Sequence, residues 1–356
     1  MSKKRWCQLV AALFAGLLVL LTALVVFVDP FEIYHRALFY QPPYSSDTQM
    51  YANAGVAKSY VYDSIIVGTS VPENCRPSVS ENALGGRFVK LPMNGGLARD
   101  HAKMMDIAFH THDVRRVVYG LDLFAFSQYY TNQKAVTPDY LYDDNLLNDV
   151  SYIFNKTVLL RYVPESIARA HTEPTDGARD TMYFWNPPSM PSETELFAQI
   201  DFASPPAAAQ PDDMLAGFTL DNYTENLLPY IRNHPETTFT VFFPPYSLLY
   251  WAQQTQDGMM DVRIAQRSQL AQLLLAEPNV ELYDFQMKTE WTEDYSLYFD
   301  LIHYVSSVND AMALAMAEGD CRITDLTQVE ENSRALACAA LSLFDIPSAT
   351  PERSLP

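Results

Sequence analysis

The sequence predicts an α/β fold held at a membrane by one apolar helix. Three observations favour this fold class: a long apolar run near the N-terminus, several short apolar runs further along, and helical stretches between most of the short runs. A short, continuous apolar run is typical of a strand that is covered on both faces of a sheet. Strands that alternate with helices indicate a parallel sheet.

The long apolar run covers residues 9–28 and contains no charge. Its twenty residues, at about 1.5 Å each, span roughly 30 Å, the thickness of a bilayer's hydrocarbon core. Three cations precede the run, and Asp29 and Glu32 follow it, which predicts a single-pass protein of the cell membrane with a cytoplasmic N-terminus and an extracytoplasmic main domain. The alternative is a cleaved signal peptide, but the run is longer than a signal core and residues 26–28 offer no small-residue cleavage site.

The predicted sheet has five strands, near residues 64–68, 87–91, 116–120, 238–243 and 279–283. Helices are expected between most of them, at 97–109, 221–233 and 261–276. The alternation stops over about 126–220, which is rich in Tyr, Asp and Pro, so we expect a partly helical insertion that serves either as a substrate wall or as decoration. The predicted organisation is an anchor at 1–28, a connector at 29–60, one α/β domain at 61–345 and a disordered tail at 346–356.

The chain is acidic, with 24 Lys and Arg residues against 43 Asp and Glu residues and a net charge of −19. Such a surface repels nucleic acid, and no basic stripe offsets it, so we expect no nucleic-acid partner. Because 48% of the residues are hydrophobic, the chain can bury a substantial core. Acidity by itself indicates solubility and identifies no substrate.

Four cysteines are spread along the chain, namely Cys7, Cys75, Cys321 and Cys338. Three of them follow the apolar run, an odd number that indicates no complete disulfide framework, although a bridge between the last two is open. Their spacing does not match a zinc pattern, and His110 and His112 lack a neighbouring pair of carboxylates or of cysteines. We therefore expect no metal and no cofactor.

The first chemical motif follows the first predicted strand and reads Gly68-Thr69-Ser70-Val71-Pro72. A serine in that place lies at the carboxyl end of its strand, where open α/β sheets carry their sites. Gly68 allows a tight turn, and Pro72 suits the first turn of a helix whose free amides would face a negative charge growing near Ser70. Taken alone, the serine is more often a helix cap.

The second motif lies near the end of the chain, where Asp300 stands three residues before His303. At that spacing the carboxylate can hold the imidazole in one tautomer and leave the other ring nitrogen to accept a proton from a serine. Taken alone, the pair is more often a surface carboxylate beside a hydrogen-bonded histidine. Asp100 and His101 are a rival pair, but adjacent positions of a helix point to different faces.

Together and in this order, the two motifs resemble the SGNH (GDSL-like) hydrolase superfamily. The layout is most similar to membrane-anchored members that act on cell-surface polymers, such as the D-alanine transfer protein DltD and the alginate O-acetylation proteins, which share a short anchor, a start like Asp29-Pro30-Phe31 and a large insertion. The resemblance implies a flavodoxin-like, three-layer α/β/α fold with a parallel five-stranded sheet in the order 2-1-3-4-5.

The resemblance also implies roles for named residues. Ser70 would be the nucleophile, His303 the general base and Asp300 its orienting partner. The family's second block supplies a glycine amide to the oxyanion hole, a position that Gly95 or Gly96 matches. The chain departs from the family at the third block. The family has Gly-x-Asn-Asp there, with the asparagine donating to the oxyanion, and this chain has Gly120-Leu121-Asp122. An ionised Asp122 cannot donate to an oxyanion, and losing such a donor costs on the order of 3–4 kcal/mol.

These patterns predict a serine acyl esterase or O-acyltransferase that acts on a cell-envelope polysaccharide or teichoic-acid-like polymer. Hydrolysis and transfer differ only in the final acceptor, so the residues do not choose between them. The resemblance implies a polytopic membrane O-acyltransferase as a partner. Two alternatives stay open: a catalytically silent scaffold or glycan-binding protein, which the Asp122 departure suggests, and a surface lipase, for which the acidic, Tyr-rich chain offers little support.

Overall fold

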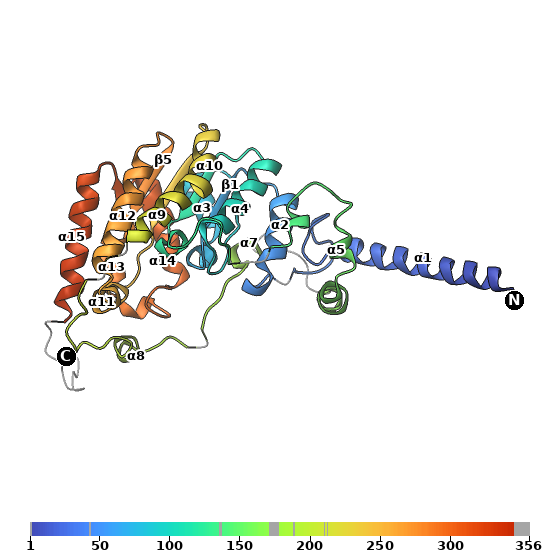
Figure 1. Ribbon diagram of the computed structural model, residues 1–356, viewed down its shortest axis with the longest axis horizontal. Helices are drawn as coiled ribbons and strands as arrows, with labels where there is room; N and C mark the ends of the chain where they lie inside the picture. The colour runs from blue at the N-terminus through green and yellow to red at the C-terminus, as the bar shows by residue number, and fades with distance from the viewer. Residues whose placement is uncertain are drawn as a thin grey trace. The chain divides into compact units, whose positions relative to one another are not determined.

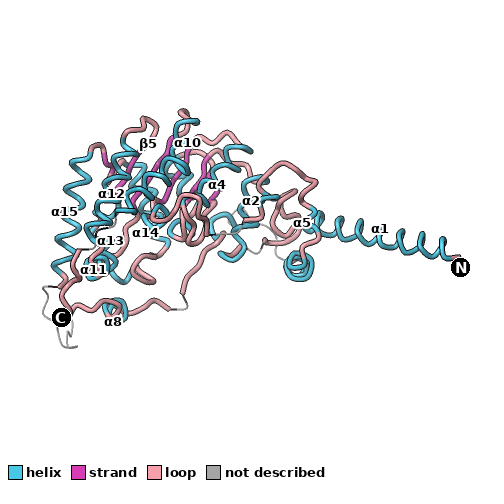
Figure 2. The backbone as a smooth tube through the Cα atoms, in the orientation of Figure 1, coloured by secondary structure: helices cyan, strands magenta, loops and turns pink. Residues whose placement is uncertain are grey.

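The computed structural model describes residues 2–42, 44–134, 137–170, 178–187, 189–209, 211 and 213–344. The chain forms two compact units, one made of Met1–Val61 and Val136–Ala178 and the other of Tyr62–Ala135 and Arg179–Pro356. We call them the anchor unit and the sheet unit. Figure 1 labels their helices and strands, and Figure 2 separates helix, strand and loop.

The sheet unit is built around one six-stranded sheet with the order β2-β1-β3-β4-β5-β6. The strands are β1 (Ser64–Val67), β2 (Phe88–Lys90), β3 (Arg116–Gly120), β4 (Thr238–Phe243), β5 (Val280–Asp284) and β6 (Arg322–Ile323). The first five pair in parallel, and their predicted order 2-1-3-4-5 is confirmed.

The predicted number of strands and the purely parallel sheet are wrong, because β6 adds an antiparallel edge. It pairs Ile323 with Leu282 and Arg322 with Tyr283. Two residues carry no periodic pattern, and only one of them is buried, so nothing in the local sequence marks this strand. Its place depends on the chain returning to β5 after helix α14 (Ser306–Glu318).

Helices of the sheet unit connect and cover the strands. The longer ones are α3 (Pro77–Leu84), α4 (Ala98–Thr111), α9 (Asp213–Asn222), α11 (Leu248–Gln256), α12 (Met260–Leu275), α14 (Ser306–Glu318) and α15 (Leu326–Ser342). Shorter turns of helix are η2 (Val71–Asn74), η3 (Leu123–Phe126), α7 (Ala178–Thr181), α8 (Glu193–Phe197), η6 (Tyr223–Leu227), α10 (Leu228–Asn233), η7 (Phe285–Met287), α13 (Thr289–Thr292) and η8 (Tyr295–Leu297).

Both faces of the sheet are covered, which gives an α/β architecture with three layers. On one face Val118 of β3 and Met312 of α14 line the same small apolar space, together with residues of α3. On the opposite face Phe109 of α4 stacks on Phe239 of β4, with ring centroids 6.3 Å apart, and α12 packs against β5. The buried positions of both faces explain why the strands read as continuous apolar runs.

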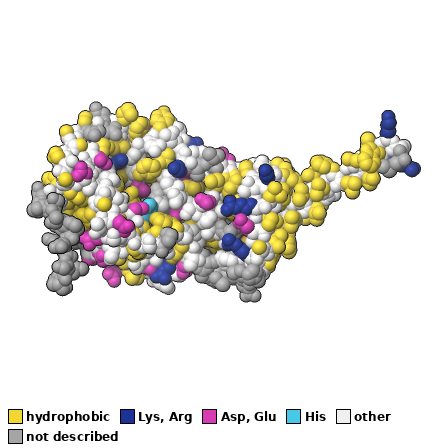
Figure 3. All heavy atoms as spheres, turned by 90° about the horizontal axis from the view of Figure 1, so that it is seen from below, with side chains coloured by type: hydrophobic (Ala, Val, Ile, Leu, Met, Phe, Trp, Pro, Cys, Tyr) yellow, Lys and Arg dark blue, Asp and Glu magenta, His cyan; other side chains and the backbone are white. Residues whose placement is uncertain are grey.

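The anchor unit begins with α1 (Lys3–Val28), the one helix among the described residues that is long and apolar enough to cross a membrane. The most apolar 18 residues of α1 have a mean hydropathy of 2.9, and only 6% of these residues are buried. Figure 3 shows hydrophobic side chains covering it. The unit's other helical elements are η1 (Ser46–Thr48), α2 (Gln49–Ser59), η4 (Asp139–Leu141), α5 (Val150–Ile153), η5 (Val158–Tyr162) and α6 (Val163–Ala168).

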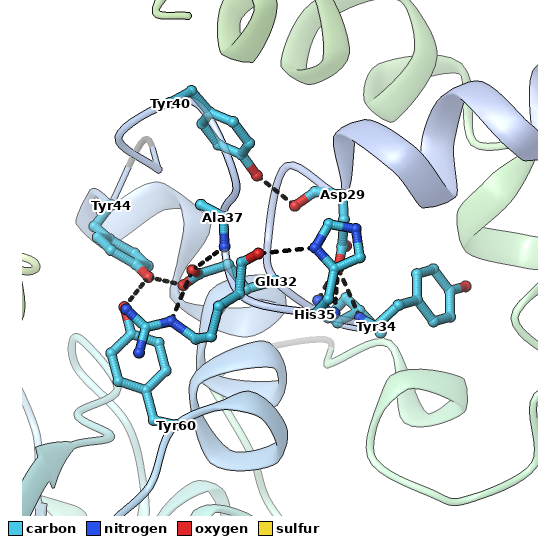
Figure 4. Close-up of polar contacts among 10 residues, drawn as sticks. Asp29, Glu32, Tyr34, His35, Ala37, Tyr40, Tyr44 and Tyr60 are labelled. Carbon is cyan, nitrogen blue, oxygen red and sulfur yellow. Dashed lines mark hydrogen bonds and ion pairs between the residues drawn. The ribbon is translucent and has the colours of Figure 1, made fainter. Parts of the chain in front are cut away.

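Two buried carboxylates organise the chain directly after α1 (Figure 4). The Asp29 carboxylate accepts the backbone N–H groups of Ile33, Tyr34 and His35, at 2.7–3.0 Å. Glu32 accepts the backbone N–H of Ala37 at 2.7 Å and also bonds to Arg36 and the Tyr44 hydroxyl. Polar side chains thus satisfy the backbone N–H groups of the loop that follows α1.

The bounds of the two units differ from the domain bounds that we expected from the sequence. The predicted insertion at 126–220 is divided, because 136–178 clusters with the first 61 residues and the remainder with the sheet. The predicted connector holds α2, and the part of the insertion expected to be helical holds α5, η5 and α6. The predicted tail at 346–356 lies outside the described residues. None of the four cysteines is bonded to another, so a Cys321–Cys338 bridge is absent from the described residues.

Candidate active site

Ser70 lies three residues past Val67, the last residue of β1, at the carboxyl end of the parallel strands. It precedes η2 as its N-terminal capping position. Gly68 has φ +155°, and a Cβ there would lie 2.9 Å from Pro72 Cγ and 3.2 Å from the carbonyl oxygen of Gly120. The turn that presents Ser70 therefore requires glycine at position 68.

The structure brings Ser70, His303 and Asp300 together across 233 positions of sequence. Ser70 Oγ lies 2.7 Å from His303 Nε2, and His303 Nδ1 lies 2.7 Å from Asp300 Oδ2. The other carboxylate oxygen of Asp300 accepts the backbone N–H groups of Ile302 and His303, both at 2.7 Å. This is the hydrogen-bonded order of a serine, a base and an orienting acid; the catalytic roles of the three residues stay a prediction.

The environment of the pair keeps Asp300 charged. Partial burial opposes ionisation of Asp300, but the hydrogen bond and the charge of His303, with the two backbone N–H groups, outweigh it and hold the pKa of Asp300 below its usual value. An ionised Asp300 accepts the Nδ1 proton, which leaves Nε2 unprotonated and facing the serine. The His303 side chain is 23% exposed, so solvent and substrate can reach the ring.

An aromatic wall borders His303. The Trp185 ring lies edge-on to the His303 ring, with centroids 4.9 Å apart, and Phe299 lies 5.4 Å from Trp185. The Asn74 side chain holds the Trp185 backbone at both ends, since its Oδ1 accepts the Trp185 N–H at 3.1 Å and its Nδ2 donates to the Trp185 carbonyl at 3.0 Å. Because Asn74 lies in η2, the turn that follows Ser70 also fixes this wall.

A buried lysine ties the same two segments together. Lys90 of β2 is fully buried, and its ammonium donates to the carbonyl oxygens of Glu73 at 2.6 Å, Cys75 at 2.9 Å and Asp180 at 3.1 Å. Three acceptors satisfy all three N–H groups. Burial lowers the pKa of Lys90 to about 7, so this support is weakest in alkaline solution.

Asp122 lies beside the serine turn and accepts hydrogen bonds from two neighbouring groups. The Thr69 hydroxyl donates to its Oδ2 at 3.1 Å, and the Phe124 N–H donates to its Oδ1 at 3.0 Å. Both oxygens act as acceptors, and Thr69 is the residue directly before Ser70. Asp122 therefore braces the turn that carries the serine, in place of the donor that the family pattern has there.

The two glycines predicted for the oxyanion hole differ in the structure. The Gly96 N–H donates to the carbonyl oxygen of Met93 at 2.7 Å and is therefore occupied. The Gly95 N–H makes no hydrogen bond within the described residues, and Gly95 has φ +59° in the turn after β2. The Met93 N–H bonds to the Gly68 carbonyl at 2.9 Å, which keeps this turn next to the serine turn. Gly95 is the better candidate, and its role stays a prediction.

The rival pair of Asp100 and His101 does not form a hydrogen-bonded pair of side chains; each residue has other partners. His101 is fully buried, where desolvation lowers its pKa to about 3, and its Nδ1 lies 2.7 Å from the Tyr119 hydroxyl. Asp100 accepts the N–H groups of Leu97 and Lys134, so the two side chains serve different partners. Among the described residues no group of His, Cys, Asp and Glu side chains could hold a metal ion.

Four residues that support the segments around Ser70 and His303 were not predicted from the sequence: Thr69, Asn74, Lys90 and Trp185. A lysine inside an apolar strand is a detectable signal, because a buried cation needs acceptors around it. Trp185 and Asn74 gave no such signal, since they meet only after 111 positions of intervening chain have folded.

Comparisons with known proteins identify no family for this chain. No protein-family profile matches the chain, and no curated protein matches its sequence. Among solved structures, a Streptococcus pneumoniae protein described as a platelet activating factor aligns over 77% of this chain and 90% of its own, with 11% sequence identity and a TM-score of 0.41. A likeness of that size carries no argument about function.

Proposed function

We propose that the protein is a serine acyl esterase or O-acyltransferase. The observation that supports this most is the continuous hydrogen-bonded chain from Ser70 Oγ through His303 to Asp300, at 2.7 Å for each link. A serine with a histidine base and an oriented tautomer is the arrangement that activates a hydroxyl as a nucleophile.

In the proposed reaction Ser70 Oγ attacks the carbonyl carbon of an acyl ester while its proton moves to His303 Nε2. The carbonyl oxygen becomes negative and faces the N–H groups of Ser70 and Gly95, neither of which makes a hydrogen bond within the described residues. The protonated His303 then gives its proton to the departing alcohol. Water or a sugar hydroxyl, deprotonated by His303, finally displaces Ser70 from the acyl group.

The proposed substrate is a cell-envelope polysaccharide or a teichoic-acid-like polymer. It rests on the resemblance of the motifs and layout to anchored SGNH proteins, and on a helix that can hold the chain at a membrane. The three cations at the start of α1 favour a cytoplasmic N-terminus and an extracytoplasmic sheet unit. A polytopic membrane O-acyltransferase is the partner that such a system would need, because it would carry the acyl group across the membrane.

A catalytically silent scaffold or glycan-binding protein is the second candidate. The observation that favours it is Asp122, whose two oxygens both accept hydrogen bonds where the family pattern has a donor. One missing oxyanion donor lowers a rate by roughly a hundred- to a thousandfold. A protein that has lost this donor could keep its glycan-binding surface without turnover.

A fluorophosphonate probe on the full-length protein in detergent separates the two. An activated Ser70 is expected to be covalently labelled, and Ser70→Ala to lose the label without a change in melting temperature. Ser296→Ala, at an exposed serine on η8, is the matched control and should label like the natural chain. Failure of the natural chain to label would leave the scaffold as the better hypothesis.

A further inference from the structure

One part of the anchor unit exposes many large apolar side chains. They lie between positions 146 and 167, and their exposed fractions are 71% for Leu146, 87% for Leu147, 52% for Val150, 70% for Leu160 and 47% for Ile167. Phe154, at 37%, belongs to the same stretch. Scattered exposed apolar residues are ordinary, but a concentration of this kind within some twenty residues marks an interaction surface.

The same stretch reverses the charge of the chain. From 146 to 169 it contains three cations, Lys156, Arg161 and Arg169, against two carboxylates, the buried Asp149 and Glu165, whereas the chain as a whole has a net charge of −19. All three cations are exposed, and Glu165 pairs with Arg161 at 3.2 Å. A basic, apolar surface on a strongly acidic protein is complementary to anionic phosphate groups.

This stretch is attached to the end of the membrane helix. Helices α5 and α6 pack against α1, and Figure 1 shows α5 beside its C-terminal end. Phe31, three residues past α1, lies 4.7 Å from the Tyr162 ring and 6.4 Å from the Tyr152 ring. Tyr152 and Tyr162 are buried, so their aromatic contacts leave the neighbouring apolar side chains pointing outward.

We propose that residues 146–169 form a membrane-contacting collar around the base of α1. Its leucines, isoleucine and phenylalanine enter the interfacial layer of the leaflet that the C-terminal end of α1 reaches, and Lys156, Arg161 and Arg169 contact lipid phosphates. Two observations select a lipid surface as the occupant: the apolar patch lies on helices that pack against the apolar α1, and its exposed cations are opposite in charge to anionic lipid.

The collar also explains the position of the buried polar groups that follow α1. A helix that enters a bilayer must have its last carbonyl groups satisfied before the chain returns to water. His35 Nε2 bonds to the Val26 carbonyl in the last turn of α1 at 2.8 Å, and the Tyr40 hydroxyl bonds to the Asp29 carbonyl at 2.5 Å. These bonds close the end of α1 at the level where the collar would meet the lipid.

Fluorescence quenching in nanodiscs tests the collar on the full-length chain. The label NBD is attached to Leu160→Cys in a background where Cys7, Cys321 and Cys338 are serine, and Cys75 is kept because it is buried. Leu314→Cys on α14, at 54% exposure, is the matched control. We expect nitroxide on the shallow acyl carbons of phosphatidylcholine to quench the label at 160 at least about twofold more than the label at 314.

Charge variants and lipid composition complete the test. In nanodiscs that contain phosphatidylglycerol, Arg161→Glu with Arg169→Glu should reduce quenching at 160, and the same change in pure phosphatidylcholine should have a smaller effect. Equal quenching at 160 and 314 would overturn the proposal. A blue-shifted label at 160 that the nitroxide lipid does not quench would also overturn it, because the surface would then be covered by protein, a second copy included.

Discussion

Each of the two units holds a histidine whose ring nitrogens both have partners, and the partners differ in kind. In the sheet unit His303 lies between the Asp300 carboxylate and the Ser70 hydroxyl, at 2.7 Å from each. In the anchor unit His35 lies between two backbone carbonyl oxygens, those of Arg36 and Val26, at 2.8 Å from each.

The difference decides which ring can move a proton. A carbonyl oxygen only accepts, so both nitrogens of His35 must carry a proton to make both bonds. Burial works against that charge, but the two carbonyl bonds and the charges of Asp29 and Glu32 raise the pKa of His35 above its usual value. A hydroxyl can donate, so His303 can leave Nε2 bare and act as a base. The first histidine is suited to holding structure and the second to catalysis.

The carboxylates beside the two histidines follow the same division. Complete burial raises the pKa of Asp29 to about 6, although it accepts three backbone N–H groups. Asp300 is partly exposed and bonded to His303, and its pKa lies below the usual value. A carboxylate that stays charged can orient a catalytic imidazole. The buried Asp29 pairs with backbone N–H groups, but its raised pKa means that it takes up a proton more readily than Asp300.

The largest expected effect is the contrast between the same substitution at the two histidines. His303→Gln should lower acyl-ester turnover and fluorophosphonate labelling by roughly 10⁵-fold, because glutamine cannot take the serine proton. Its melting temperature should stay within about 2 °C of the natural chain, since the ring is at a partly exposed site. Steady-state kinetics on an aryl acetate and thermal unfolding measure the two quantities; retained turnover would contradict the role given to His303.

Asp300→Asn tests whether the Asp300 carboxylate sets the tautomer of His303. The asparagine amide would donate to His303 Nδ1, which places the remaining ring proton on Nε2 and leaves no base facing Ser70. We expect a loss of about 10³- to 10⁴-fold in turnover. The control is Asp294→Asn, a carboxylate that caps η8 outside the relay, for which turnover should be unchanged. An equal loss in both variants would point to folding instead of tautomer control.

His35→Gln is the counterpart in the anchor unit. Glutamine cannot reproduce the two fixed bonds to the Val26 and Arg36 carbonyls, and a buried carbonyl left unpaired costs about 1–3 kcal/mol. The melting temperature should fall by several degrees, while fluorophosphonate labelling of the folded protein stays unchanged. Loss of labelling at a temperature where the variant is folded would show that the two histidines are not independent.

The last expected effect is a pH dependence of stability that Asp29 should impose. Its pKa is raised from 3.8 to about 6, so the folded protein binds more protons than the unfolded chain between these values. The contribution is therefore complete below pH 4 and is lost as the pH rises through 6. Asp29→Asn cannot ionise, so its melting temperature relative to the natural chain should improve steadily from pH 4 to pH 7. A difference that is constant over this range would count against a raised pKa.

The sequence alone determined those features that depend on short stretches of chain. An uncharged apolar run is enough to define α1, because crossing a bilayer requires only length and hydrophobicity. The five parallel strands and their order followed from apolar runs and from the resemblance, and Gly68 and Pro72 marked the turn that carries Ser70. Apart from the strand order, which the resemblance implied, the physical requirement in each case is met within one continuous segment of the chain.

Tertiary structure alone decided what depends on contacts between distant segments. The edge strand β6, the grouping of 136–178 with the first 61 residues and the wall of Trp185 held by Asn74 are all of this kind. So is the choice between Gly95 and Gly96, because the bond of Gly96 to Met93 exists only once the turn has formed. Composition and spacing describe what a segment can do, but which donor meets which acceptor is settled by packing, since an unpaired buried polar group is costly.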